Sequence, residues 1–104
     1  MNDGRSLTIL QVNDSHGCLD LHGEMFFSGA HGDYRAAGGW GRLAALIEVI
    51  RNSKPGQMLT FDCGDTIHGT HAAVRTRGQA LVPILNAVGF DAMTAHWEFA
   101  YGPQ

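Results

Sequence analysis

The apolar positions of this chain follow two different periods, and each predicts a kind of element. Residues 7–12 (LTILQV) carry apolar side chains at both parities, which is typical of a strand buried on both faces of a parallel sheet. Residues 58–61 (MLTF) predict a second strand, and residues 90–94 (FDAMT) predict a third. Between them lie two stretches with helical spacing. These are Leu43, Leu46, Ile47 and Ile50, and then Leu81, Ile84, Leu85 and Val88.

The ends of both helices can be placed from their glycines and prolines. The first helix should begin after Gly38-Gly39 and end near Asn52, because the residue before Pro55 resists helical geometry. The second should begin at about residue 80, which places Pro83 in its first turn, and Gly89 is suited to its C-terminal cap.

The order strand, helix, strand, helix, strand predicts an α/β fold with a parallel sheet and right-handed crossovers. Both helices should then cover the same sheet face. The opposite face would expose an apolar patch, so we expect the chain to self-associate or to be poorly stable. Residues 18–39 are rich in glycine and histidine and show no clean period. We interpret them as a loop or insertion within a single domain, 1–104, that is either functional or mobile.

Composition excludes several classes of protein. A hydrophobic fraction of 44% and a charged fraction of 16% are those of a globular chain, and the formal net charge is -3. We find no basic run for a nucleic-acid polymer and no apolar run near the roughly 18 residues of a membrane span. The N-terminus does not read as a signal peptide, so we expect a cytoplasmic location, or a periplasmic one if a leader is missing. Cys18 and Cys63 suggest neither a disulfide framework nor a zinc knuckle.

Three polar clusters each follow a predicted strand: residues 14–16 (DSH), 62–65 (DCGD) and 96–98 (HWE). Ligands bind beyond the carboxyl ends of the strands in open parallel sheets, so the three clusters should gather at one edge. Asp14 and His16, two residues apart in an extended segment, should project from the same side and share one cation. Mixed oxygen and nitrogen ligation suits Mn, Fe or Zn. Gly64 should aim Asp65 back over the strand end, where its carboxylate could bridge two metals, and His96 could bind the second.

Each of these residues also has an ordinary structural interpretation. Asp14 could cap a turn, His16 could face solvent, Asp65 could belong to a turn, and His96 could bind a backbone carbonyl. Trp97 and Phe99 are more typical of a core. We interpret the histidines of the loop after Asp65, His68 and His71, as solvated.

Taken together, the motifs resemble the calcineurin-like metallophosphoesterases, and more closely their 5'-nucleotidase branch. The resemblance rests on four stretches in the right order, LTILQVNDSHG, GGWGRLAALIEVIR, LTFDCGDTIHGT and ILNAVGFDAMTAHWEFAYGP, and covers most of the chain outside residues 18–37. It implies the βαβαβ half of a four-layer αββα sandwich that holds two divalent metal ions. Asp14 and His16 would bind the first ion and Asp65 would bridge both. The family takes further ligands from two later histidines that these 104 residues lack, so the resemblance implies an incomplete, N-terminal part of a catalytic domain.

The final motif departs from the family pattern. The nucleotidases read G-N-H-E-F-D-Y-G, whereas this chain has His96 in place of the Asn, Trp97 in place of the catalytic His and Ala100 in place of its orienting Asp. His96 can still bind a metal, but an indole is no usable acid or base near neutral pH. Losing a general acid or base typically costs about 10²- to 10⁴-fold in rate.

The sequence therefore predicts a dinuclear-metal hydrolase of phosphoesters with a small, nucleotide-like substrate and a metal-activated water, although these residues alone would be inactive. No catalytic side chain can be assigned. Two alternatives stay open. The H-W-E-F motif resembles the thiosulfohydrolases of the same superfamily, which cleave an S-sulfonate. The chain could also be a non-catalytic metal-binding domain.

Overall fold

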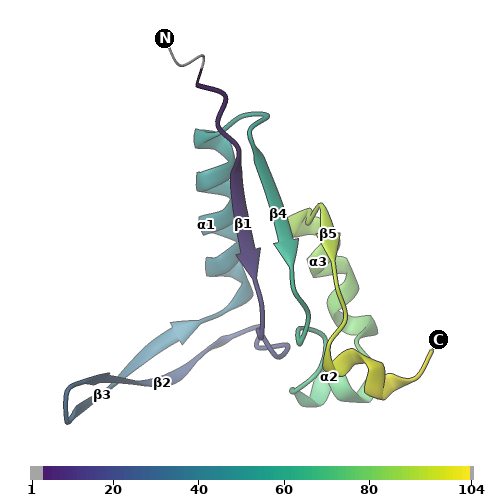
Figure 1. Ribbon diagram of the computed structural model, residues 1–104. Helices are drawn as coiled ribbons and strands as arrows, with labels where there is room; N and C mark the ends of the chain where they lie inside the picture. Colours follow the sequence, from purple (N-terminus) through teal and green to yellow (C-terminus); the bar gives the residue numbers. More distant parts are fainter. Residues whose placement is uncertain (1–3, 104) are drawn as a thin grey trace.

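The computed structural model describes residues 4–103 and confirms the alternation of strands and helices (Figure 1). The elements of the α/β part are β1 (Thr8–Val12), α1 (Trp40–Ser53), β4 (Met58–Asp62), α3 (Val82–Val88) and β5 (Ala92–Met93). The sheet has the order β1-β4-β5, and both strand pairs are parallel. The predicted third strand is shorter than expected, with two residues in place of five.

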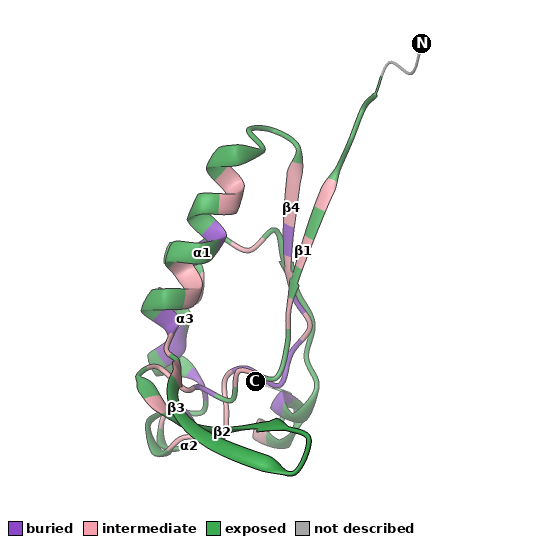
Figure 2. Ribbon diagram, turned by 90° about the vertical axis from the view of Figure 1, so that its left-hand side faces the viewer, coloured by how far each residue is buried: buried purple, intermediate pink, exposed green. Residues whose placement is uncertain are grey.

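Both helices lie on the same face of the sheet, as the two crossovers require (Figure 2). The core between them and the sheet is built around Trp40 and Ile47 of α1 and Val88 of α3. The strands contribute Leu10 and Val12 from the helix-facing parity of β1. Burial of this apolar stripe is the main force that holds the helices to the sheet.

The helix ends agree closely with the sequence prediction. Helix α1 begins at Trp40 and ends at Ser53, one residue beyond the predicted end. Pro83 lies in the first turn of α3, and Gly89 caps its C-terminus in the left-handed conformation at φ 74°. A short 3-10 turn, η1 (Gln79–Leu81), leads directly into α3.

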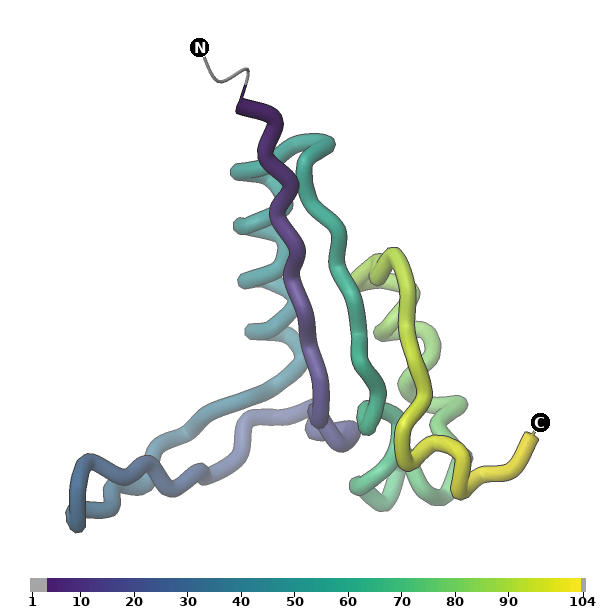
Figure 3. The backbone as a smooth tube through the Cα atoms, viewed as in Figure 1, coloured from purple at the N-terminus to yellow at the C-terminus, as the bar shows by residue number. Residues whose placement is uncertain are grey.

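Residues 18–39 were interpreted as a loop or insertion, and the structure shows that most of them form an antiparallel hairpin inserted between β1 and α1. Strand β2 (Leu21–Ser28) pairs with β3 (His31–Gly38) over its whole length. The hairpin projects from the rest of the chain (Figure 3), and its side chains are mostly exposed on both faces. A strand without a buried face has no need of alternating apolar residues, so its period is invisible in the sequence.

The projecting hairpin also sets the dimensions of the molecule. The radius of gyration is 16.2 Å, whereas a compact chain of this length should have about 13 Å. At its base the hairpin is tied to the α/β part by the Trp40 N–H, which donates to the Leu19 carbonyl at 3.0 Å.

Two further short elements flank the edge of the sheet where the strands end. Helix α2 (His71–Arg75), which the sequence analysis missed, is capped by the Thr70 hydroxyl, which accepts from the Ala73 N–H at 3.3 Å. The 3-10 turn η2 (Trp97–Tyr101) contains the last motif. Within residues 4–103, none of the helices has the length and apolar character that crossing a membrane requires.

The sheet face opposite the helices is open, as predicted. Leu7 and Ile9 are 58% and 62% exposed there, and Leu59, the register partner of Ile9, lies on the same face. We expect the isolated chain to self-associate through this face, with light scattering giving a mass above that of a monomer. Charged residues at both exposed positions (Leu7→Lys with Ile9→Lys) should restore the monomer. A wild-type chain that is monodisperse and monomeric at high concentration would contradict this expectation.

Candidate metal centre

The loops that follow β1 and β4 run side by side beyond the end of the sheet, and this pairing brings the candidate ligands together. The Cys63 N–H donates to the Val12 carbonyl at 2.8 Å and continues the ladder. The Asp14 N–H then donates to the Gly64 carbonyl, and the His16 N–H to the Asp65 carbonyl, each at 3.1 Å. The predicted gathering of polar clusters at this edge is therefore built by backbone hydrogen bonds.

Asp14, His16 and Asp65 form one compact cluster. One ligand atom from each lies within 4.8 Å of the others. His16 Nε2 lies 3.0 Å from Asp65 Oδ2 and 3.7 Å from Asp14 Oδ1. His96 approaches the same carboxylate, with Nδ1 3.7 Å from Asp65 Oδ2. The four predicted ligands thus lie close together, and Asp65 is the residue that approaches both His16 and His96.

The way Asp14 and His16 converge differs from the prediction of an extended segment. Both residues lie in the left-handed region, at φ 56° and 50°, and Asp65 does so at φ 60°. Only one other non-glycine residue of the described chain, Arg77, has a positive φ. Left-handed backbone costs a residue with a Cβ roughly 1 kcal/mol or more, and such strain concentrates at functional sites.

Gly64 allows the chain to turn beneath the cluster. It has φ 88°, and a Cβ at this position would lie 2.8 Å from the Thr94 carbonyl oxygen and 3.0 Å from the His96 nitrogen. Because both atoms are backbone, no side-chain rotation can relieve the contact. A side chain here would push the segment after β5 away from the segment after β4.

We therefore expect Gly64→Ala to destabilise the fold by roughly 2 kcal/mol or more, through left-handed strain and the backbone contact together. Gly56→Ala is the matched control, since Gly56 has φ 70° but a Cβ added there would meet nothing within 4 Å. Urea unfolding of both variants measures the difference. Equal losses of stability in the two variants would show that the close approach at Gly64 has no energetic consequence.

Glu98 is a buried carboxylate that ties the last motif to the loop carrying Asp65. It is 8% exposed. Its Oε2 accepts from the His96 N–H at 2.7 Å and the Asp65 N–H at 3.1 Å, and its Oε1 accepts from the Thr66 N–H at 2.6 Å. Burial raises the pKa of Glu98, but these backbone donors outweigh it and lower the pKa to about 2. Through these contacts Glu98 holds the backbone of His96, Asp65 and Thr66 in place.

A second buried carboxylate, Asp62, supports the same loop from the strand side. Its Oδ1 accepts from the Gly64 N–H at 2.8 Å and from the Thr66 hydroxyl at 2.7 Å. Burial raises the pKa of Asp62, and the nearby Glu98 charge adds to the rise. Its Oδ2 is buried without a partner. Asp62 and Glu98 thus hold residues 64–67 from two sides.

The aromatic residues Trp97 and Phe99 of the last motif lie at the surface. Trp97 is 63% exposed and Phe99 is 76% exposed, so the expectation that they pack in a core was wrong. Trp97 instead lies edge-on to His96, with ring centroids 6.0 Å apart. The anchor of this segment is polar, because the Tyr101 hydroxyl donates to the Ile67 carbonyl at 3.0 Å and Glu98 receives the loop amides.

His68 also lies at the cluster, so the expectation that it is a solvated loop residue was wrong. Its Nε2 contacts Asp65 Oδ1, and its side chain is 22% exposed. His71, at the start of α2, is exposed as predicted. The spacing of His68 and His71 in the sequence does not show which of them lies at the site. The turn at Gly69 directs His68 there.

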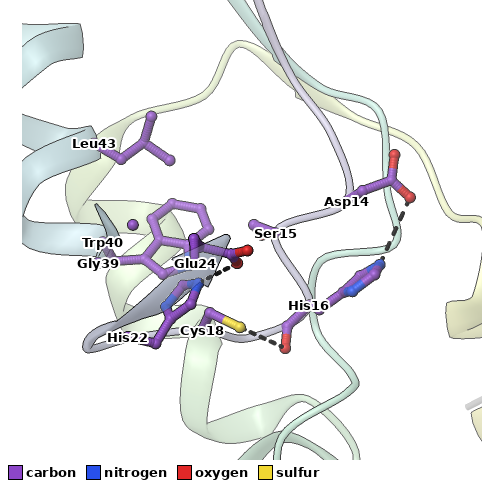
Figure 4. A pocket seen from close by; sticks show the side chains of 10 residues that line it. Asp14, Ser15, His16, Cys18, His22, Glu24, Gly39, Trp40 and Leu43 are labelled. Carbon is purple, nitrogen blue, oxygen red and sulfur yellow. Dashed lines mark hydrogen bonds and ion pairs between the residues drawn. The ribbon is translucent and has the colours of Figure 1, made fainter. Parts of the chain in front are cut away.

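A cavity of about 300 Å³ adjoins the cluster on the side of the hairpin (Figure 4). Asp14 and His16 border it on one side, and His22 and Glu24 of β2 border it on the other, joined by a 2.8 Å contact between His22 Nε2 and Glu24 Oε1. Two of the wall residues, Ser15 and Trp40, have buried side-chain polar atoms without a partner. Asp14 and His16 of the cluster are therefore accessible from this hollow.

The cysteines take no part in a disulfide. Cys18 and Cys63 are both free and partly buried.

Curated proteins with similar sequences are 5'-nucleotidases. The chain is 36% identical over 87 residues to the 5'-nucleotidase of Bos taurus and 33% identical over 87 residues to that of Homo sapiens. Each match covers 84% of this chain and 15% of the relative, so the chain spans about one seventh of the length of these proteins. No family model matches the chain.

Solved structures with the same fold point to the same superfamily. The Haemophilus influenzae NAD nucleotidase superposes with a TM-score of 0.74 at 27% identity, over 86% of this chain and 16% of that protein. The 5'-nucleotidase precursor of Thermus thermophilus gives 0.69 at 26% identity, over 86% and 17%. The sulfate thiohydrolase SoxB of the same organism gives 0.79 at 24% identity, over 98% and 27%, which shows a shared fold. By sequence and by fold, the chain belongs to the calcineurin-like metallophosphoesterases, in their 5'-nucleotidase branch.

Proposed function

We propose that this chain supplies the first part of a divalent-metal site in a hydrolase that acts on phosphoesters of nucleotide-like size. The observation that carries the proposal is the cluster of Asp14, His16 and Asp65 at the carboxyl ends of parallel strands. The 5'-nucleotidases that the chain resembles support the choice of substrate class.

The donor set fits a divalent cation. Two carboxylates and one imidazole offer oxygen and nitrogen ligands, the mixture that suits Mn, Zn or Fe. Asp14 is ready to bind as an anion, because the Asn13 amide at 2.5 Å and then the contact with Asp65 lower its pKa. His96, beside Asp65 Oδ2, would contribute to a second ion. When bound, such ions lower the pKa of a coordinated water and stabilise charge on phosphoryl oxygens.

The residues of the site fall into two groups: those that would bind the metal, and those that hold the metal-binding residues in place. Asp14, His16, Asp65 and His96 have ligand atoms that lie close to one another. Glu98 and Asp62 fix the backbone of the Asp65 loop through hydrogen bonds. Such supporting contacts set ligand orientation, which matters for metal affinity almost as much as the ligands do.

The position occupied by a catalytic histidine in the resembled nucleotidases supplies no proton here. Trp97 stands there, and an indole N–H is a hydrogen-bond donor without acid or base function near neutral pH. Substrates whose leaving group departs without protonation should therefore react faster than those that leave as a sugar alkoxide. This predicts a preference for activated phosphoesters.

An assay with p-nitrophenyl phosphate and a nucleoside 5'-monophosphate tests the proposal. The whole protein that carries these residues, supplied with Mn²⁺, should hydrolyse the activated ester, EDTA should stop the reaction, and the nucleotide should react more slowly. Absence of any metal-dependent hydrolysis by the whole protein when it binds Mn²⁺ would contradict the proposed activity.

A second candidate function is hydrolysis of an S-sulfonate, which the H-W-E-F motif favours because a thiolate leaves without an acid. Release of sulfate from an S-sulfonated cysteine peptide, with no phosphate released from either ester, would decide for it. Metal binding without turnover of any of these substrates would instead indicate a non-catalytic domain.

A further inference from the structure

His68 reaches Asp65 from the side that the other candidate ligands leave free. Asp65 Oδ2 faces His16 Nε2 at 3.0 Å and His96 Nδ1 at 3.7 Å, whereas Oδ1 is in contact with His68 Nε2. One oxygen of this carboxylate thus faces the candidate ligands, and the other contacts His68.

The ring of His68 is held in this place by packing as well. It stacks on the His16 ring with centroids 5.6 Å apart and planes inclined by 28°. With only 22% of its side chain exposed, it is an integral part of the site. The His68 ring therefore supports one ligand by stacking and a second by contact with its carboxylate.

Two glycines allow the backbone to deliver His68 to the site. Gly69 has φ 98°, and a Cβ on it would lie 2.8 Å from the His16 carbonyl oxygen. Gly17 has φ 64°, and a Cβ on it would lie 2.9 Å from Thr70 Oγ1. The segment after His68 thus passes against the segment after His16, at a separation that side chains on either glycine would prevent.

We propose that His68 is a positioning residue of the metal site, donating from Nε2–H to Asp65 Oδ1 and so directing Oδ2 toward the cation. It is distinct from the ligand cluster, which comprises Asp14, His16 and Asp65. Without such a donor the carboxylate can rotate, and Oδ2 then no longer faces the cation. Outer donors of this kind typically change metal affinity by about 10- to 100-fold. This inference rests on the proposed metal site.

Mn²⁺ titration followed by electron paramagnetic resonance, with the 104-residue chain and four variants, tests the role of His68. His68→Ala and His68→Asn should bind Mn²⁺ about 10- to 100-fold more weakly than the wild type. His68→Gln should recover most of the affinity, because its longer amide can place an N–H near the position of Nε2. His71→Ala, at an exposed histidine three residues away, should bind like the wild type. Circular dichroism checks that each variant is folded, and His68→Asn replaces His68→Ala if the latter is not.

The outcomes separate this inference from the proposed function. Wild-type affinity in folded His68→Ala or His68→Asn, or a His68→Gln variant as weak as His68→Asn, would overturn the positioning role while leaving the metal site intact. A wild-type chain that binds no Mn²⁺ would contradict the metal site itself. In that case the ¹⁵N spectrum of metal-free protein still reports on His68: a proton on Nε2 agrees with donation to Asp65, and a proton on Nδ1 alone excludes it.

Discussion

Replacing Asp65 by Asn should reduce Mn²⁺ affinity by at least about 100-fold, the largest effect expected of any single change in the cluster. Mutation of a supporting residue typically lowers the affinity of a metal site by about 10- to 100-fold. Loss of a ligand should lower the affinity further. Asp65 contacts His16, His68 and His96, so its carboxylate lies at the centre of the candidate ligands. The amide keeps the size of the side chain but removes the charge that attracts the cation.

Isothermal titration calorimetry with Mn²⁺ measures this loss. Asp33→Asn is the matched control, because Asp33 is an exposed carboxylate on the projecting hairpin, paired with Arg35 at 2.9 Å. It should leave affinity unchanged. If Asp65→Asn bound Mn²⁺ as tightly as Asp33→Asn, Asp65 would not be a ligand.

Replacing Glu98 by Gln should produce the largest loss of stability. The carboxylate accepts from several backbone N–H groups, and the amide of Gln would point a donor at some of them. Each buried donor left without a partner costs roughly 1–3 kcal/mol. We therefore expect the free energy of unfolding at pH 7 to fall by roughly 3 kcal/mol.

The same contact predicts a specific dependence on pH. The pKa of Glu98 is lowered from its ordinary value of 4.5 to about 2 in the folded chain. A lowered pKa stabilises the fold above the unfolded value, so the contribution of roughly 3 kcal/mol is complete above about pH 5 and is lost as the pH falls toward 2. The difference in stability between wild type and Glu98→Gln should shrink over the same range.

Urea unfolding at pH 7, 4 and 3 tests both statements. Glu48→Gln provides the control, since Glu48 lies on the exposed side of α1 and its ion pair with Arg51, at 3.6 Å, contributes little. A Glu98→Gln variant as stable as Glu48→Gln at pH 7, or a difference that does not change with pH, would contradict the role assigned to this carboxylate.

The parts of the fold that could be predicted are those in which burial dictates the sequence. The residues of α1 and β1 that face the core, such as Ile47 and Leu10, record their packing directly, and Pro83 and Gly89 mark the ends of α3. Leu46 of the predicted helical stripe and Ile9 on the other face of β1 are exposed, so the prediction that these two positions are buried was wrong. The hairpin could not be predicted in the same way, because its strands bury neither face and carry no period. Helix α2, at five residues, is too short to show a stripe.

In the site, too, some features could be predicted from the sequence and others could not. That Asp14, His16 and Asp65 lie together followed from strand order alone, because parallel strands end at one edge. Their left-handed backbone did not follow, since no sequence pattern distinguishes an extended D-x-H segment from a tight turn. The contact of His68 with Asp65 depends on a close approach at Gly69, and the exposure of Trp97 depends on which side of η2 faces the loop.

The proposed function depends above all on whether Asp14, His16 and Asp65 bind one divalent cation. A crystal structure of the Mn²⁺-soaked chain, with anomalous differences recorded at the manganese edge, locates the ion. We predict an anomalous peak within bonding distance of one nitrogen of His16 and of oxygens of Asp14 and Asp65. A peak elsewhere, or no peak in a chain whose cluster is intact, would contradict the assignment of these three residues as ligands.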